Sequence, residues 1–148
     1  MDLPTLLRES PAFATLSDID LRSLAAAMVV SRHEGGHVFL RPGERGGDVF
    51  FVLEGQVEVV TRGSAFPVRT LAPGSLFGLL ALVDQEPRST TCTAAGPCTV
   101  AVLPHPATPL LFNQSAPLAC AFQKAVALQL ATDFRNLSTL LQHLAHEE

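Results

Sequence analysis

The chain has 148 residues, a formal net charge of −4 and a hydrophobic share of 47%. This length can bury a sizeable core, and the high apolar share excludes an intrinsically disordered chain. The acidic balance, without a basic run, argues against a nucleic-acid-binding protein. All its apolar runs are shorter than the roughly 18–20 residues that a membrane span needs.

The N-terminal residues 3–28 are predicted to be helical. Ser17 has the character of a helix N-cap, and Asp20 is placed to complete a capping box with it. Apolar residues then recur at steps of three or four, which is typical of an amphipathic helix that packs on a core. These residues are Leu16, Leu21, Leu24, Ala25 and Met28.

From Val29 to Leu103 the sequence predicts β-strands. The segments are short, rich in Val, Phe and Thr, and separated by Gly, Pro, Ser or charged turns. Regularly spaced short strands of this kind indicate a jelly-roll or β-roll. The predicted strands are 28–33, 37–41, 48–54, 56–62, 66–71, 90–95 and 98–103.

One stretch between these strands, from Phe77 to Thr91, has the composition of an anion-binding loop. Glycines break its beginning, a short apolar run follows that suits one or two helical turns, and Pro87, Arg88 and three hydroxyl side chains end it. Free N–H groups at a helix start attract anions, and an arginine adds a two-pronged donor for phosphate. We therefore predict that Arg88 and Ser89 contact a phosphate-like group.

The C-terminal region is predicted to form two helices. A short one is expected over 107–114, and a long one from Pro117, at the first helical position, to His146. At 1.5 Å per residue the long helix would span about 40 Å, more than one roll can cover. Its later apolar steps alternate four and three, as in a coiled-coil seam, which favours a homodimer over packing on the roll alone. The seam residues are Leu130, Phe134, Leu137, Leu141 and Leu144.

The loop from Phe77 to Thr91 resembles the phosphate-binding cassette of the cyclic nucleotide-binding domain family. The family pattern Phe-Gly-Glu-Leu-Ala-Leu, followed by Pro-Arg-Ser/Ala-Ala/Thr, departs from this chain chiefly at Leu79. The glycine-rich segment 42–57 and the N-terminal segment 11–25 also resemble this family. The matching residues are Phe77, Gly78, Leu80, Ala81, Leu82, Pro87, Arg88, Ser89 and Thr90.

The resemblance, which covers roughly residues 5–142, implies an α+β fold. It predicts an antiparallel β-roll of about eight strands with N-terminal helices and a long C-terminal helix. One domain is expected over 1–148, without the helix-turn-helix domain that follows in family members that are transcription factors. Family members dimerise through the long helix, which agrees with the predicted seam.

The implied function is a cytoplasmic, non-enzymatic regulatory module that senses cAMP, cGMP or another small anion. The family glutamate that grips the ribose 2′-hydroxyl is Leu79 here, so we expect binding to be weakened roughly 10- to 100-fold or altered. Some guanosine-preferring members place a hydroxyl at the position of Thr90. The candidate ligand-binding residues are Phe77, Gly78, Leu79, Leu80, Ala81, Arg88, Ser89 and Thr90.

Several alternatives remain open in the sequence. Thr132, Asp133 and Asn136 are candidate base contacts, although polar residues of this kind are more typical of a solvated helix face. A dimeric protein-interaction module with a non-functional pocket is the alternative function.

Other chemistry finds little support. His33 and His37, with Glu44 downstream, only loosely match the metal pattern of cupins, and no metal or cofactor is predicted. The three cysteines Cys92, Cys98 and Cys120 form no CxxC motif and are predicted to be free thiols. No sequence pattern predicts a nucleophile–base pair.

Overall fold

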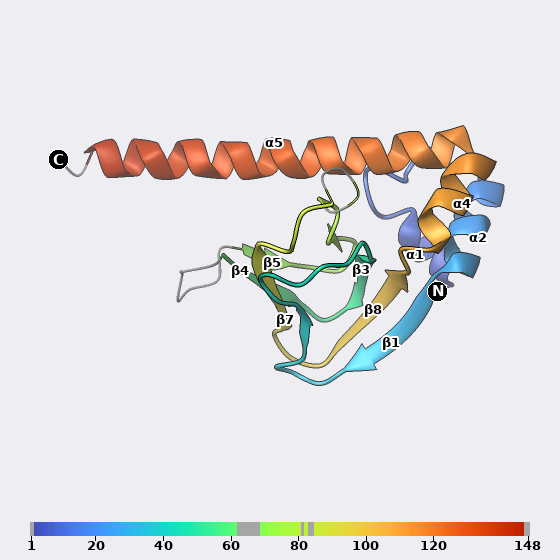
Figure 1. Ribbon diagram of the computed structural model, residues 1–148, viewed down its shortest axis with the longest axis horizontal. Coiled ribbons are helices and arrows are strands. Elements are labelled where there is room, and N and C mark those ends of the chain that lie inside the picture. The colour runs from blue at the N-terminus through green and yellow to red at the C-terminus, as the bar shows by residue number, and fades with distance from the viewer. Residues whose placement is uncertain (1, 62–68, 81, 83–84, 147–148) are drawn as a thin grey trace.

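The computed structural model describes residues 2–61, 69–80, 82 and 85–146. Two four-stranded antiparallel sheets form a β-roll, with strand orders β1-β8-β3-β6 and β2-β7-β4-β5. Figure 1 shows α1, α2 and α4 gathered at one end of the roll and α5 lying across it. The strands are β1 (Val29–His33), β2 (Val38–Leu40), β3 (Val49–Glu54), β4 (Val57–Thr61), β5 (Arg69–Leu71), β6 (Leu76–Phe77), β7 (Thr90–Ala94) and β8 (Cys98–Leu103).

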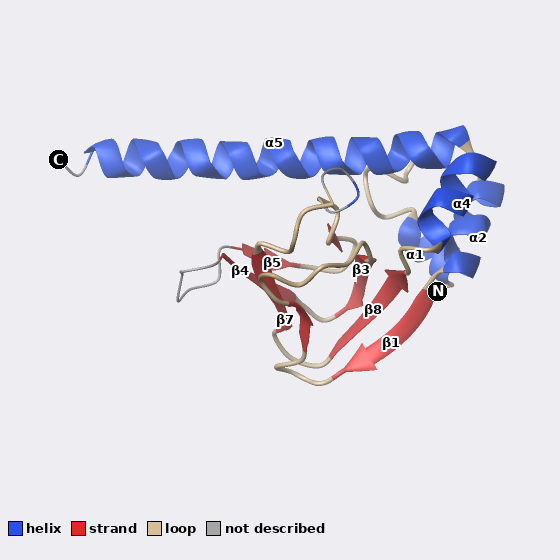
Figure 2. Ribbon diagram, viewed as in Figure 1, coloured by secondary structure: helices blue, strands red, loops and turns tan. Residues whose placement is uncertain are grey.

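This architecture confirms the predicted α+β fold, and Figure 2 shows the separation of strands and helices. The predicted strand 98–103 coincides with β8, and the other six contain an observed strand within their limits. β6 was not predicted, because Phe77 stood in what the sequence presents as a turn. Its two residues pair with Phe50 and Phe51 of β3, and such a short strand has no periodicity to recognise.

The core divides into two clusters on the two faces of β3. Val49 and Phe51 belong to a cluster that includes the helices, whereas Phe50 and Val52 belong to a cluster inside the roll. This alternation is the period-two geometry of a strand. Because both faces are buried, β3 reads as a continuous apolar run in the sequence.

The N-terminal region is less helical than predicted. The helices are α1 (Leu3–Leu7) and α2 (Asp18–Ala27), and residues 8–15 between them form turns around Pro11. Ser17 caps α2 as expected, since its Oγ accepts a hydrogen bond from the Asp20 backbone N–H at 3.1 Å. The Asp20 carboxylate is engaged elsewhere, accepting a hydrogen bond from Ser115 Oγ at 2.9 Å.

Two helices follow the roll, α4 (Ala107–Gln114) and α5 (Ala116–His146). Pro117 therefore occupies the second helical position rather than the first. The first three turns of α5 are docked, with Leu118, Phe122 and Val126 buried in the helix-side core cluster. Further along, α5 runs past β4 and β5 (Figure 1). No helix within the described ranges has both the length and the apolarity to span a membrane.

Candidate functional site

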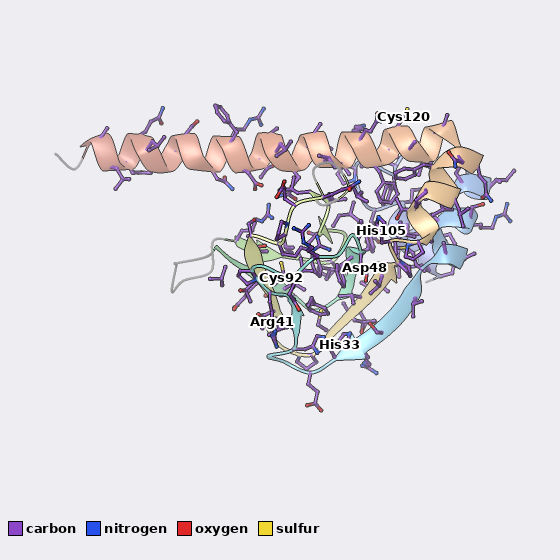
Figure 3. The ribbon with its side chains drawn as sticks, in the orientation of Figure 1. His33, Arg41, Asp48, Cys92, His105 and Cys120 are labelled. Atoms are coloured by element: carbon purple, nitrogen blue, oxygen red, sulfur yellow. The ribbon has the colours of Figure 1, made fainter. Side chains whose placement is uncertain are left out.

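A cavity of about 470 Å³ lies between the roll and α5. Its walls come from β2, β4, β5, β6 and β7, from the loop that precedes β7, and from one face of α5. In Figure 3, Cys92 of β7 marks the part of the roll that faces α5. The lining residues of the roll and its loops are Leu40, Val59, Arg69, Phe77, Gly78, Leu79, Leu80, Glu86, Pro87, Arg88, Ser89, Thr90 and Cys92.

Arg88 is a firmly positioned charged side chain of the cavity. Its Nη1 donates to the Gly78 carbonyl and its Nη2 to the Asp48 carbonyl, both at 2.9 Å. Its backbone is also fixed, because Arg88 N–H donates to the Glu44 carbonyl at 2.7 Å and its own carbonyl accepts from Gly43 N–H at 2.8 Å. Two segments of the chain therefore hold the guanidinium, and a third holds the backbone of Arg88.

The electrostatics of Arg88 follow from this position. Burial lowers the pKa of the Arg88 guanidinium from its ordinary value, while Asp48 and the neighbouring groups Cys92 and Glu44 oppose the shift. An arginine remains charged despite such a shift, because its ordinary pKa lies far above neutral pH. Arg88 therefore places a partly buried positive charge on the wall of the cavity.

Only glycine fits at position 78, because the segments that contain Asp48 and Arg88 come very close to it. Its φ is +81°, and a Cβ at this position would lie 2.8 Å from the Asp48 carbonyl oxygen and 3.3 Å from Arg88 Nη1. Any other residue would meet both the positive φ and the backbone oxygen. The sequence predicts a turn at Gly78, and the structure adds that this turn supplies an acceptor for Arg88.

Asp48 extends this wall to the end of the roll. Its carboxylate accepts a hydrogen bond from the His105 backbone N–H at 2.9 Å, and the two residues lie side by side in Figure 3. His105 lies two residues before α4, so this hydrogen bond fastens the segment of Asp48 to the start of the C-terminal helices.

Leu79 lines the cavity but belongs mostly to the core. It is only 4% exposed and packs in the helix-side cluster that contains Leu118 and Phe122 of α5. Leu79 thus gives the cavity an apolar wall at this position. Ala81, also predicted to contribute a backbone amide, lies outside the described residues.

The three α5 candidates do not lie together. Asp133 and Asn136 line the cavity, as does Gln129, which the sequence reasoning missed. Thr132, in contrast, is exposed, is not among the lining residues, and donates its hydroxyl to the Leu128 carbonyl at 3.0 Å. The reason is helical phase: positions 129, 133 and 136 share one face, and 132 is turned about 100° away from 133.

Arg69 is a second cation of the cavity that the sequence reasoning missed. Its Nη1 contacts Asp133 Oδ1 at 2.8 Å, and Gln129 Nε2 donates to the same oxygen at 3.1 Å. This ion pair joins β5 to α5. No pattern in the sequence around Arg69 could indicate its role in the cavity, because its partner Asp133 lies 64 positions further along the chain.

Cys92 lies on the cavity wall near both arginines. Burial raises the pKa of the Cys92 thiol, and a hydrogen bond from Thr90 and the charges of Arg69 and Arg88 counteract that rise only in part. A thiol in this state is largely protonated near neutral pH and is therefore a poor nucleophile.

His33 and His37 come together, although they do so outside the cavity. Gly35 and Gly36 form part of the turn between them, and the two imidazoles stack with ring centroids 3.9 Å apart. Within the residues that the structure describes, no group of three or more His, Cys, Asp or Glu side chains could hold a metal ion.

Comparisons with known proteins agree on one family. The model of the cyclic nucleotide-binding domain matches residues 30–115. A cyclic nucleotide-gated potassium channel of Mesorhizobium japonicum is 35% identical over 119 residues, which cover 80% of this chain and 32% of the channel. A cAMP-dependent protein kinase regulatory subunit of Mycosarcoma maydis is 33% identical over 92 residues, covering 61% of this chain and 18% of the subunit.

A solved structure supports the fold independently. A cyclic nucleotide-binding domain of Methylobacillus flagellatus superposes with a TM-score of 0.81 at 21% identity, covering 95% of this chain and 82% of that one. The chain spans less than a third of the length of the two curated relatives above. The matched region is therefore only a part of each of these longer relatives.

Proposed function

Because the chain belongs to the cyclic nucleotide-binding domain family, we propose that it is a regulatory module that binds a nucleoside cyclic phosphate in the cavity under α5. It acts by binding and performs no catalysis. The observation that carries this proposal is the placement of Arg88 on the cavity wall.

Arg88 is suited to a singly charged phosphate. A guanidinium has five N–H donors, and only two of those on Arg88 donate to the Gly78 and Asp48 carbonyls. The remaining donors, with the hydroxyls of Ser89 and Thr90 on the same wall, can satisfy phosphate oxygens. Both hydrogen-bond partners of the guanidinium are carbonyls, which carry no formal charge, although the carboxylates of Asp48 and Glu44 act on it electrostatically.

Leu79 sets the strength of this binding. In the family pattern a glutamate at this position accepts a hydrogen bond from the ribose 2′-hydroxyl. Here that hydroxyl would face an apolar side chain, so affinity should fall by roughly 10- to 100-fold. We therefore expect cAMP and cGMP to bind weakly, and ligands without a free 2′-hydroxyl to lose less.

The signal would leave the site through α5. This helix contributes Gln129, Asp133 and Asn136 to the cavity, so a ligand there contacts the roll and the helix together. A ligand that prefers one packing of α5 over another shifts the population between them. The exposed apolar residues Phe134, Leu141 and Leu144 further along α5 provide a surface for a second copy of this chain.

Thermal-shift titration with cAMP and cGMP at millimolar concentration tests the proposal. A ligand at 100 times its Kd stabilises the folded state by about 2.7 kcal/mol, which raises Tm by several degrees for a domain of this size. Leu79→Glu should strengthen binding, although a carboxyl in this buried position lowers the Tm of the unliganded protein. Each variant is therefore compared with its own unliganded Tm.

The control variants separate binding from stability. Arg88→Ala removes the bonds to Gly78 and Asp48 as well as the phosphate contact, so Arg88→Lys is measured beside it. The lysine keeps the positive charge but cannot donate two parallel hydrogen bonds to a phosphate, and we expect it to weaken binding by roughly tenfold. Arg32→Ala, an exposed arginine on β1 outside the cavity, should leave the shift unchanged.

The alternative is a dimeric protein-interaction module whose pocket binds nothing. The burial of Leu79 in the core favours it, because a pocket wall that serves packing need not serve a ligand. A flat thermal response to every nucleotide, in the native chain and in Leu79→Glu, would favour this alternative, or a ligand outside the panel, over a cyclic nucleotide sensor.

A further inference from the structure

Two histidines face each other at the corner of the roll between β1 and β2. His33 ends β1 and His37 immediately precedes β2, and their imidazole rings stack with centroids 3.9 Å apart and an angle of 23° between the planes. His33 is half-buried and His37 is exposed. In Figure 3, His33 lies on the side of the roll away from α5. This pair, the histidine stack, is thus separate from the cavity wall.

A series of aromatic contacts leads from the histidine stack to the cavity. Phe39 meets both imidazoles edge-on, with its ring centroid 5.1 Å from that of His33 and 4.8 Å from that of His37. The same ring lies 5.5 Å from the ring of Phe77, which lines the cavity. The residue after Phe77 is the glycine whose carbonyl accepts a hydrogen bond from Arg88. Phe39 therefore connects the stack to the wall that holds Arg88.

The groups packed around the stack offer no charge that would compensate two protons. Cys98 of β8 stands opposite His33, but burial raises the pKa of its thiol, so it is uncharged in the range where histidine titrates. β7 presents Thr93 and Ala94 to β2. The neighbours of Phe39 on β3 and β6 are phenylalanines. Among the described residues, the charge that acts on the pKa of His33 is that of His37. The charged residues of the adjoining strands and turns are exposed, and they are Arg32, Glu34, Arg41 and Glu54.

The stack can hold one proton more easily than two. A single imidazolium can stack on a neutral imidazole, whereas two imidazolium rings at 3.9 Å bring like charges into contact. Burial lowers the pKa of His33 from its ordinary value, and the charge of His37 lowers it further. Ser31 Oγ lies 2.8 Å from His33 Nε2 and can donate to a neutral ring or accept from a protonated one. Acid therefore acts on the contact between the rings and leaves this hydrogen bond available.

We propose that the histidine stack is a pH-sensitive contact that regulates the cavity: when both rings are protonated they separate, Phe39 loses its packing partners, and anion binding at Arg88 weakens. The ligand part of this inference rests on the proposed function, whereas the effect on stability concerns the unliganded chain. Because folding hinders protonation of His33, the stability that the stack contributes is complete above about pH 6.5 and is lost as the pH falls below that value.

The unfolding temperature as a function of pH tests the stack without any ligand. Between pH 7.0 and 5.5 we expect the Tm of the native chain to fall by about 2–4 °C more than that of His37→Gln, whose amide cannot be protonated. His33→Phe, which keeps a ring in the stack without a titrating nitrogen, should resemble His37→Gln. The matched control is His143→Gln, an exposed histidine near the end of α5, and it should follow the native curve. Parallel curves for the native chain and both stack variants would overturn the inference.

Calorimetric titration of cAMP at pH 7.0 and 5.5 tests the connection to the cavity. The lining residues that the structure describes include no histidine, the side chain whose ordinary pKa lies in this range. We expect the affinity of the native chain for cAMP to fall at least roughly threefold on acidification, and His37→Gln to lose most of that fall. An equal fall in His37→Gln would place the origin of the pH effect elsewhere and would contradict the inference.

Phe39→Leu tests the path between the stack and the cavity. Leucine has no ring to bridge the imidazoles and Phe77, so this variant should retain the acid-sensitive Tm while its cAMP affinity no longer depends on pH. If its affinity falls on acidification as in the native chain, Phe39 is not the connection and the inference is wrong. Absence of cAMP and cGMP binding at both pH values would instead overturn the proposed function and the ligand part of this inference. The Tm comparison would still decide whether the stack responds to pH.

Discussion

The two halves of α5 are built from similar residues and meet different surroundings. In the first half Leu118 is 1% exposed and Phe122 is 2% exposed, both packed against the N-terminal helices and the roll. In the second half Phe134 is 69% exposed and Leu141 is 56% exposed. An amphipathic pattern shows that a helix has a face to bury, and it does not show what buries that face.

The strongest test of this difference is a matched pair of truncations. Phe122→Ala should destabilise the fold by about 3–5 kcal/mol, because the ring packs between Phe13 and Phe112 and its removal leaves a cavity. That corresponds to a fall in Tm of about 10 °C or more. Phe134→Ala should stay within about 0.5 kcal/mol under monomeric conditions. Equal losses in urea unfolding would mean that the second half is docked as firmly as the first.

The second half should matter for association instead. Phe134→Glu combined with Leu141→Glu places charges on the exposed apolar stripe, and we expect dimer dissociation to increase by at least roughly tenfold. Sedimentation equilibrium measures the change, and circular dichroism checks that the fold is kept. A native chain that is monomeric throughout the concentration range would leave the stripe without a role in homodimerisation.

Thiol reactivity tests how firmly the first half of α5 and the roll beneath it are packed. Cys120 lies on its outer face, exposed and pointing away from the roll in Figure 3, whereas Cys92 is buried. With Ellman's reagent at pH 8 we expect Cys120 to react at least roughly tenfold faster. Because burial raises the pKa of Cys92, its thiolate fraction keeps growing at pH values where free cysteine is already ionised. Its rate should therefore still be rising above pH 9. Labelling of Cys92 as fast as Cys120 would indicate that the roll opens readily.

The smallest effect is expected where α5 begins. Ser115 Oγ accepts from the Leu118 backbone N–H at 3.3 Å and donates to Asp20 on α2. Ser115→Ala removes both bonds and should cost about 1 kcal/mol, as loss of an N-cap usually does. Ser138→Ala, on the same helix beyond its docked half, is the control and should be nearly neutral. A cost at Ser115 no larger than at Ser138 would show that this junction is not a fixed point of the helix.

The sequence predicted the fold well where a local pattern was sufficient. β8 and the N-cap at Ser17 followed from strand composition and capping chemistry. β6 was missed because a two-residue strand shows no periodicity. The turns over 8–15 were wrongly included in the predicted helical segment 3–28, although the apolar periodicity that supports a helix begins only at Leu16.

The cavity was predicted only as far as its residues are contiguous. Gly78, Leu79 and Arg88 stand in one stretch and could be found together. Arg69 and Gln129 could not, because their place in the cavity depends on how α5 lies over β5. Helical geometry also explains why Thr132 lies away from the cavity while Asp133 lines it, since neighbours in a helical sequence point in different directions.

The length of α5 has a mechanical consequence. Its 31 residues form a rod of about 46 Å at 1.5 Å per residue. The rod is anchored near Ser115 and contacts the cavity near its middle, at Gln129 and Asp133. A tilt of about 5° at the anchor would carry the far end through about 4 Å on this length. A displacement of α5 at Gln129, about 20 Å from the start of the helix, would be roughly doubled at its far end.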